Sequence, residues 1–289
     1  MFHAVKCTKI LLWFLARIPT RRLFRDLWIN PAEYYVESAD NFLARMKAFN
    51  VTHKGKKILE IGSGNSFGWG YSFLLNGVGE YTSSDVVRTP SMSKKAIHVE
   101  KELIRLVGKR YKSDMLEQSM HFSKHSITSS NKKLRFKQLD ITSNHIDRAV
   151  SYDVIISNAV FEHIHKDRVD QAIKNMYLLL NINGKMLHHI DLRDHFNMDQ
   201  KFNFLRYSDR SWSYLTNETH FYTNRLRAND FIELFRKNGF KVTNIRRNIV
   251  DVSAEDIRKY AHESFQHYSD EDLKTISFSI SLQKQGIRL

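Results

Sequence analysis

The chain has 289 residues, of which 42% are hydrophobic and 26% charged, and this is the size and composition of one elaborated, soluble globular domain. Cys7 is the only cysteine, which excludes an intramolecular disulfide and a cysteine-rich zinc site and fits a reducing, cytoplasmic location. The formal net charge of +14 favours anionic partners, but the basic residues are spread along the chain, so a basic solvated surface explains the charge as well as a nucleic-acid groove does.

The N-terminus carries an apolar run over residues 10–16 with lysines and arginines on both sides. The run is too short to span a bilayer, and no small-residue cleavage site of a signal peptide follows it. Because a basic helix with Trp13 and Phe14 can lie in a membrane interface, residues 9–25 are a candidate for peripheral contact with the inner membrane face. Packing of the same helix over the domain's own core is an equal alternative.

Apolar spacing predicts alternating helices and strands along the first half of the chain. In chain order they are a helix over 31–49, a strand over 57–61, a helix over 67–75 and a strand over 80–84. A longer stretch over 91–133 then separates the second strand from the third. Its middle, 99–115, has the pattern of a charged amphipathic helix, and 126–131 has that of a polar loop.

The second half continues the alternation. In chain order the expected elements are strands over 134–139 and 152–157, a helix over 169–180, a strand over 185–192, a helix over 228–237, and strands over 240–249 and 276–282 joined through a helical insertion near 254–265. The run 152–157 is apolar without interruption, as in a parallel strand buried on both faces. Strands that alternate with helices indicate an α/β sheet with its ligand at the carboxyl ends of the strands.

A glycine-rich turn follows the first strand in the segment E-I-G-S-G, residues 60–64. Its glycines let the backbone bend sharply and approach a ligand, and the helix behind them offers free N–H groups. A dinucleotide fingerprint would have its third glycine where Phe67 stands. Glu60, two residues before the first glycine, would repel a pyrophosphate and attract a cationic ligand instead.

Several segments between residues 57 and 192 resemble the motifs of class I S-adenosylmethionine-dependent methyltransferases, in the family's order and spacing. The turn E-I-G-S-G-N is similar to motif I, Asp85 to the ribose-binding acid, and Asp140-Ile141 to the adenine-contacting position. Residues 152–163, which end in S-N-A-V-F-E-H, are similar to the fourth-strand motif. The resemblance implies a Rossmann-like α/β fold, with a mostly parallel seven-stranded sheet flanked by helices, and S-adenosyl-L-methionine as the cofactor.

The residues that the resemblance assigns to the cofactor lie at the carboxyl ends of strands. They are Glu60, Gly62, Ser63, Gly64, Asp85, Asp140, Ile141 and Asn158. The turn residues would hold the methionine end, Asp85 the ribose hydroxyls and Asp140 the adenine amine, while Asn158 would line the pocket near the sulfonium. Carboxylates at consecutive strand ends suit the ammonium, sulfonium and ribose diol of this cofactor and disfavour phosphates.

The resemblance also sets the expected domain organisation. Residues 1–50 would form an N-terminal helical extension and residues 51–289 the methyltransferase domain. The interval 91–133 is much longer than the single helix usual in the family, so we expect an insertion there, with a lid and a dimer element as its candidate roles. Residues 193–227, which are aromatic and polar without clear periodicity, are the expected acceptor region.

Two segments resemble a subgroup of methyltransferases found with bacterial polysaccharide and lipopolysaccharide biosynthesis: H-H-I-D-L-R-D-H-F over 188–196 and Y-T-N-R-L-R over 222–227. They imply O-methylation of a sugar hydroxyl in a glycan or polysaccharide precursor, with an anionic or lipid-linked acceptor as one option. Arg225 and Arg227 could grip a phosphate or uronate of the acceptor, or cap the following helix and face solvent. Five aromatic side chains could wall a sugar pocket or cover the sheet: Phe202, Phe204, Tyr207, Trp212 and Tyr214.

Methyl transfer from a sulfonium needs alignment above all, but a hydroxyl acceptor must also lose its proton. Histidine suits that task near neutral pH. Strand alternation points His189 and Asp191 to one face of the sheet and His188 to the other.

His195, just past the fifth strand, is the expected catalytic base, with Asp191 or Asp194 to orient it. His163, just past the fourth strand, is its rival. A structural hydrogen-bonding role is the alternative for each histidine. These histidines and acids could alternatively hold a divalent metal ion, but no compact spacing supports a ligand set, so no metal is expected.

An RNA methyltransferase is an alternative suggested by the basic charge. However, Asn158 is followed by Ala-Val-Phe rather than by the P-P-Y/F of amino-group methylases, and no RNA-binding appendage is recognisable, so nucleic acid is not the expected partner. A quinone or small-lipid acceptor is supported only by the N-terminal apolar run. A non-catalytic cofactor-binding protein is a further alternative, because the acids and glycines indicate binding rather than turnover. The sequence predicts no oligomeric state.

Overall fold

The computed structural model describes residues 29–64, 66–86, 93–123, 126–197, 199–216 and 222–286. The candidate membrane-surface segment 9–25 therefore lies outside the described residues. None of the helices within these ranges combines the length and the apolar character that crossing a bilayer requires.

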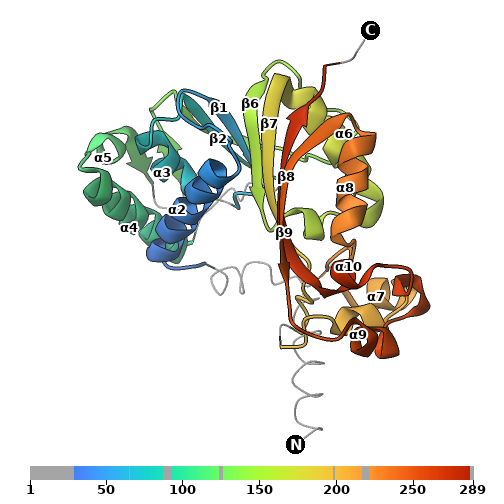
Figure 1. Ribbon diagram of the computed structural model, residues 1–289. Helices are drawn as coiled ribbons and strands as arrows, with labels where there is room; N and C mark the ends of the chain where they lie inside the picture. Colours follow the sequence, from blue (N-terminus) through green and yellow to red (C-terminus); the bar gives the residue numbers. More distant parts are fainter. Residues whose placement is uncertain are drawn as a thin grey trace, which may run out of the picture.

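A seven-stranded sheet in the order β5-β2-β1-β6-β7-β9-β8 forms the frame of the protein (Figure 1). In chain order its strands are β1 (Lys57–Ile61), β2 (Glu80–Asp85), β5 (Leu134–Gln138), β6 (Tyr152–Asn158), β7 (Leu180–Asp191), β8 (Phe240–Ile249) and β9 (Thr275–Lys284). Neighbouring strands from β5 to β7 are parallel, and β9 runs antiparallel to β7 and β8. The predicted α/β class with a mostly parallel seven-stranded sheet is confirmed.

Helices cover both faces of the sheet because its central strands are apolar on both sides. The longer helices are α2 (Ala32–Ala48), α3 (Trp69–Leu75), α4 (Lys94–Tyr111), α6 (Val169–Leu179) and α8 (Ala228–Lys237). The first three share a core cluster with Ile58 and Ile156, and the last two share another with Leu59 and Ile155. Adjacent residues of one strand thus enter different clusters, as the alternation of side chains requires.

Two helices begin at other positions than predicted, because apolar spacing does not mark where a helix starts. Helix α4 begins at Lys94, where the Ser93 hydroxyl accepts a hydrogen bond from the Ala96 amide at 3.0 Å, and it ends at Tyr111. The predicted span 99–115 is therefore wrong at both ends. Helix α3 begins two residues later than predicted, since Gly68 before it has a φ of 40°, outside the helical range.

The remainder of the insertion forms a short helix and a hairpin. Helix α5 (Met115–Ser119) leads into β3 (Met120–Phe122), which pairs with β4 (Ile127–Ser129). The predicted polar loop over 126–131 is therefore wrong in part. The reason is Ile127, whose side chain is buried in the same core cluster as α2 and α4 and holds the strand in place.

A third core cluster lies beyond the sheet, where α7 (Asp209–Thr216), α9 (Ala254–Tyr260) and α10 (Asp270–Lys274) gather below β8 and β9 (Figure 1). It contains most of the aromatic side chains considered for a sugar pocket. Phe202, Phe204 and Trp212 are buried in this cluster, whereas Tyr214 is exposed. Neither expectation for the set holds, since the buried members pack a separate core rather than wall a pocket or cover the sheet.

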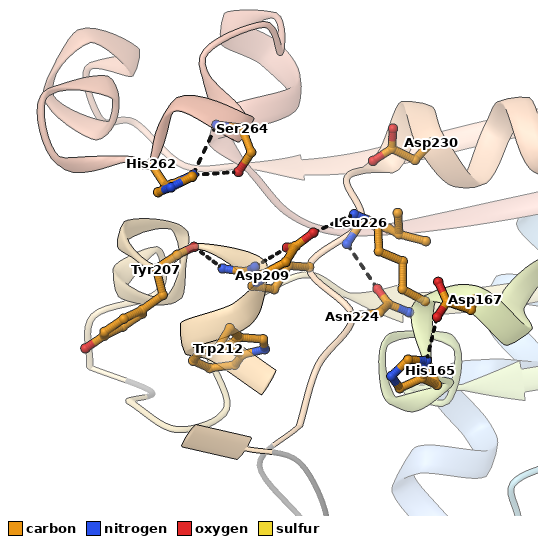
Figure 2. A network of polar contacts seen from close by, with 12 residues as sticks. His165, Asp167, Tyr207, Asp209, Trp212, Asn224, Leu226, Asp230, His262 and Ser264 are labelled. Atoms are coloured by element: carbon orange, nitrogen blue, oxygen red, sulfur yellow. Dashed lines mark hydrogen bonds and ion pairs between the residues drawn. The ribbon is translucent and has the colours of Figure 1, made fainter. Parts of the chain in front are cut away.

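Arg225 is buried beside this third core cluster. It is 3% exposed, and its guanidinium donates hydrogen bonds to the carbonyls of Phe204 and Tyr207 and to the carboxylate of Asp209. Its guanidinium also lies over the Trp212 ring, 5.5 Å from the ring centroid. Figure 2 shows Tyr207, Asp209 and Trp212 gathered in this polar network.

Arg227 is fully buried at the start of α8. Its guanidinium donates to the carbonyls of Leu192, Asp272 and Thr275, and so ties β7 and α8 to the start of β9. Burial lowers the pKa of Arg227 to about 10, with the charge of Asp272 opposing the shift, so the guanidinium stays protonated at neutral pH. Arg227 is the N-cap residue of α8, as one alternative expected, but neither arginine faces solvent, and both guanidiniums are held by buried carbonyls rather than free for an acceptor.

Replacing Arg227 by Met should destabilise the fold by about 3 kcal/mol or more, because several buried carbonyls would lose their donor. Urea denaturation followed by circular dichroism measures the change. Arg236→Met, an exposed position on the last turn of the same helix, is the matched control and should cost less than about 1 kcal/mol. Equal unfolding midpoints for Arg227→Met and the unaltered protein would contradict this role.

Candidate active site

The cofactor-binding candidates meet where the strand order of the sheet reverses. From β1 the chain moves outward to β2 and β5, and from β6 it moves to β7 on the other side. Strands β1 and β6 are neighbours, with Ile61 paired to Ser157, so their carboxyl ends flank one crevice. Open α/β sheets bind ligands at such a switch point.

The glycine turn after β1 folds onto the end of β2 and leaves one side open. The amides of Gly62 and Ser63 both donate to the Ser84 carbonyl, at 2.8 and 3.0 Å. Gly62 has a φ of 76°, and a Cβ there would stand 2.4 Å from Val160 Cγ2, so a larger residue does not fit. Gly64 has a φ of 68°, and among the described residues no atom beyond its chain neighbours lies within 4 Å of a Cβ placed there. A ligand can therefore approach the turn at Gly64.

Two carboxylates lie beside this turn. Asp85 accepts a hydrogen bond from the Gly64 amide at 3.0 Å, which fixes the turn to the end of β2. Glu60 is 7% exposed and accepts one from the Tyr81 hydroxyl at 2.8 Å. Burial raises the pKa of Glu60 to about 8, the Tyr81 hydrogen bond opposes this shift, and the charge of Asp85 adds to it. A cation in the crevice would lower the cost of ionising Glu60, so the site favours a positively charged ligand.

Asp140 and Ile141 follow β5, the strand beside β2. Asp140 is exposed, and its Oδ1 accepts hydrogen bonds from the amide and hydroxyl of Thr142 at 2.8 and 2.7 Å. The Ile141 side chain is buried in the core, and its carbonyl accepts from Asn175 at 2.7 Å. Both residues have structural contacts, and their assignment to the adenine stays a prediction.

A cavity of about 330 Å³ opens between α2 and the ends of β6 and β7. Asn158 and Ala159 line it from β6, and His189 and Asp191 line it from β7. Arg45 of α2 and His189 also line a larger groove of about 650 Å³, so the two spaces adjoin. The groove is lined further by β8 and β9.

The two histidines of β7 face opposite sides of the sheet, as strand alternation predicts. His188 is buried, with Nδ1 2.7 Å from the Ser157 hydroxyl, and burial lowers its pKa to about 3. His189 lines the cavity, with Nδ1 3.1 Å from the Ser279 hydroxyl. Burial, and then the charge of Arg45, lowers the pKa of His189 to about 4. His188 is therefore a neutral part of the core.

The rival candidate bases, His195 and His163, lie together, with ring centroids 4.9 Å apart. His195 Nε2 is 3.5 Å from the Asp191 carboxylate. Asp194 is buried and accepts instead from the Phe196 amide at 2.7 Å, within its own loop. Of the two acids considered for orienting His195, the structure therefore places Asp191 beside it.

Asp191 keeps its negative charge. Arg193 donates from Nε and Nη2 to the two carboxylate oxygens, at 2.9 and 2.5 Å. Burial favours the neutral acid, but the hydrogen bonds from His195 and Arg193 outweigh burial and hold the pKa of Asp191 well below its usual range. An ionised carboxylate beside a histidine is the arrangement of the acid–histidine pairs that serve as general bases.

A segment distant in sequence holds His163 in place. His163 ends the short helix η2 (Phe161–His163), and its Nδ1 is 2.9 Å from the Tyr222 carbonyl. The Asn224 side chain donates to the Phe161 carbonyl at 2.7 Å, and its Oδ1 accepts from the Leu226 amide, as Figure 2 shows. Tyr222 and Asn224 are thus the residues of the segment 222–227 that contact the turn carrying His163.

Glu162, the neighbour of His163, was missed by sequence reasoning. Its side chain is 2% exposed, and burial raises its pKa well above the usual range. One donor atom from each of Glu162, His163 and His195 lies within 4.8 Å of the other two. The Glu-His pair was visible in the fourth-strand motif, but its approach to His195 depends on tertiary contacts.

Comparison with known proteins places the chain in a family. The model of the methyltransferase domain family matches residues 33–245, most of the chain. A comparison with curated proteins finds no matching relative.

Similar solved structures include the S-adenosylmethionine dependent methyltransferase from Mesorhizobium loti, at 11% identity and a TM-score of 0.47 over 83% of this chain and 96% of that one. Another is the N-methyltransferase NodS from Bradyrhizobium japonicum in complex with S-adenosyl-l-homocysteine, at 15% identity and a TM-score of 0.44 over 90% of this chain and 91% of that one. The family match covers the cofactor crevice, the cavity and both candidate bases. The chain therefore belongs to the methyltransferase domain family and is a class I S-adenosylmethionine-dependent methyltransferase.

Proposed function

We propose that the protein methylates a hydroxyl of a sugar or glycan-type acceptor, in the cytoplasm or at the inner membrane face. One observation carries the proposal: Asp191, the partner of His195, lines the same cavity as Asn158, the residue expected near the sulfonium. A group that can accept a proton therefore stands close to the point where the methyl group would be offered. An oxygen acceptor needs such a group, because its proton must leave as the new bond forms.

The cofactor fits the crevice by charge and by shape. Asp85 supplies negative charge beside a turn whose open side is Gly64, and Glu60 would ionise next to a bound cation, which suits a ligand with an ammonium, a sulfonium and a ribose diol. In the proposed arrangement Glu60 and the turn residues Gly62, Ser63 and Gly64 hold the methionine end. Asp85 accepts hydrogen bonds from the ribose hydroxyls. Asp140 and Ile141 border the adenine.

The chemistry divides between cofactor and protein. S-adenosylmethionine supplies a methyl group on a positively charged sulfur, which is already a good leaving group. His195 accepts the proton of the acceptor hydroxyl, and Asp191 stabilises the resulting imidazolium. As the oxygen–carbon bond forms, the carbon–sulfur bond breaks and its electron pair stays on sulfur. His163 would help to position the acceptor.

The adjoining groove favours an acidic acceptor. Arg45 of α2 and Arg246 of β8 both line it. Burial, and then the positive charge of Arg246, lowers the pKa of Arg45, because the two positive charges repel each other. An anionic group such as a phosphate or uronate would relieve this repulsion. In this proposal Arg45 and Arg246 take the role that the sequence suggested for Arg225 and Arg227.

The proposal also assigns a role to each part of the chain. Residues 1–50 serve as a helical extension whose segment 9–25 contacts the membrane surface, residues 51–289 form the catalytic domain, and 193–227 include the acceptor region. The extension's helix α2 packs against α3 and α4 and lines the cavity, which supports a role in closing the site over the acceptor. For the insertion 91–133, the packing of α4 on α2 supports a lid-like role through that helix.

Asp85→Asn should weaken binding of S-adenosylmethionine about 10- to 100-fold, because a neutral amide accepts hydrogen bonds from the ribose less strongly than a carboxylate does. The asparagine oxygen can still accept from the Gly64 amide, so the turn should keep its shape. Isothermal titration calorimetry measures the affinity. Asp147→Asn, which removes an exposed carboxylate paired with Lys137, should leave it unchanged. If Asp85→Asn binds as well as the unaltered protein, Asp85 does not hold the ribose.

Glu60→Gln should stabilise the ligand-free protein increasingly as the pH rises from 5 to 8. The unfolded chain ionises Glu60 near its ordinary pKa, whereas the folded state keeps the proton up to about pH 8, so Glu60 lowers the stability of the fold across this window. The difference between the two proteins should grow by about 2–4 kcal/mol, measured by urea denaturation at each pH. The same variant should bind S-adenosylmethionine more weakly at pH 8.

Glu117→Gln, at an exposed position, is the control for this comparison and should show no such pH dependence. A stability difference between Glu60→Gln and the unaltered protein that is the same at pH 5 and pH 8 would mean that Glu60 is ionised in the fold at both pH values.

Glycans from cells that lack the protein should be lighter than normal by the mass of one methylene, and those glycans should accept a labelled methyl group from the purified enzyme. His195→Ala should reduce this transfer about 100-fold or more while cofactor binding persists. His121→Ala, at an exposed position on β3, should retain full activity. Unchanged glycan masses, or labelling of RNA instead, would refute the proposed acceptor class.

A further inference from the structure

The Glu162 side chain is a buried carboxylate without a hydrogen-bond partner among the described residues. It is 2% exposed, and both oxygens are shielded from solvent. The backbone amides of Glu162 and Asp191 lie near enough to favour its ionised form, but neither donates a hydrogen bond to it. Buried carboxylates are normally hydrogen-bonded, paired with a cation or bound to a metal ion. The position therefore calls for a positive ligand.

The two neighbouring histidines are oriented as metal ligands usually are. His163 Nδ1 is 2.9 Å from the Tyr222 carbonyl, and because only an N–H can pair with a carbonyl, Nε2 carries the lone pair. His195 stands 3.5 Å from the Asp191 carboxylate. Metal-bound histidines commonly use one ring nitrogen for such a carbonyl or carboxylate, which fixes the ring while the other nitrogen binds the ion.

We infer that Glu162, His163 and His195 form a binding site for a divalent transition-metal ion, at the edge of the acceptor cavity. One donor atom from each lies within 4.8 Å of the other two. In a tetrahedral site with metal–ligand distances of about 2.0–2.2 Å, the ligand atoms stand roughly 3.3–3.6 Å apart, so side-chain rotations that move the donor atoms by about 1 Å would close the site. This inference departs from the expectation of no metal, which rested on sequence spacing alone.

The donor set selects the class of ion. Two imidazoles with one carboxylate suit Zn²⁺, Co²⁺, Mn²⁺ or Fe²⁺, whereas Mg²⁺ and Ca²⁺ prefer oxygen ligands throughout. Three protein ligands leave coordination positions for water or for a substrate. Adjacent hydroxyls of a sugar could occupy those positions.

The metal site rests on the proposed function in one respect only, namely that a sugar hydroxyl fills its open coordination positions. A ring nitrogen bound to a metal ion cannot accept a proton. His195 is therefore a ligand in the metal-loaded enzyme, and its role as base belongs to the metal-free alternative. The ion would then position the acceptor oxygen and make its hydroxyl more acidic.

The test uses full-length protein freed of metal with a chelator and titrated with Co²⁺, whose visible absorption reports its ligands. We expect one equivalent to bind with micromolar or tighter affinity and to raise the melting temperature. Glu162→Gln should weaken binding at least 10- to 100-fold. Without metal this variant should melt no lower than the unaltered protein, because it removes a buried carboxylate that has no partner. His121→Ala, remote from the cluster, should bind Co²⁺ normally.

Absence of Co²⁺ binding below millimolar concentration, or equal binding by Glu162→Gln, would overturn the inference. Methyl transfer to glycans that persists after chelation, in a protein that does not bind Co²⁺, would leave the proposed function intact and remove the metal site. Tight Co²⁺ binding that depends on Glu162, in a protein that methylates no glycan, would leave the metal site intact and remove the proposed acceptor.

Discussion

Glu60 is a carboxylate held out of water at the end of β1, and the site around the glycine turn depends on that placement. Its nearest partners are the hydroxyl of Tyr81, which offers a hydrogen bond, and Asp85, which adds a second negative charge. A buried acid in such surroundings keeps its proton unless a cation arrives. The crevice therefore selects ligands by the sign of their charge. It favours cations and disfavours the phosphates that bind at the same place in many α/β sheets.

The sheet brings this charged crevice and the acceptor cavity together. Strand β1 ends at the glycine turn, and its neighbour β6 ends at Asn158, beyond which the chain turns through Glu162 and His163. Strand β7 ends at Asp191, close to His195. Because these parallel strands end at the same edge, the cofactor crevice and the histidine cluster lie in adjacent positions. Arg227 donates to the Leu192 carbonyl just past β7, and Asn224 donates to the Phe161 carbonyl in the turn that carries His163, so the segment 222–227 ties both strand ends together.

Much of this arrangement was predictable from local patterns. The strand β6 and the helix α8 are specified by uninterrupted apolar residues and by helical spacing, and both were found where expected. The order of motifs around Glu60 and Asp85 predicted an acidic crevice at the strand ends, and both acids lie there. Such features depend on residues close together in the chain.

The errors concern residues whose surroundings are set by distant parts of the chain. Arg227 looked like an exposed cation that could bind a substrate, but carbonyls from β7 and the start of β9 surround it. Ile127 stood in a polar stretch, yet its side chain is buried and its strand pairs with β3. The role inferred for the Glu162 carboxylate depends on His195, which only folding brings beside it. No spacing rule along the sequence could reveal these contacts.

Calorimetric titration of the unaltered protein at neutral pH with S-adenosylmethionine, and separately with NAD, tests the acidic crevice most directly. We expect S-adenosylmethionine to bind with one-to-one stoichiometry and NAD to give no binding heat, because Asp85 repels its pyrophosphate and Glu60, which is protonated at neutral pH, offers a phosphate no positive partner. Binding of NAD with an affinity equal to or higher than that of S-adenosylmethionine would contradict this expectation.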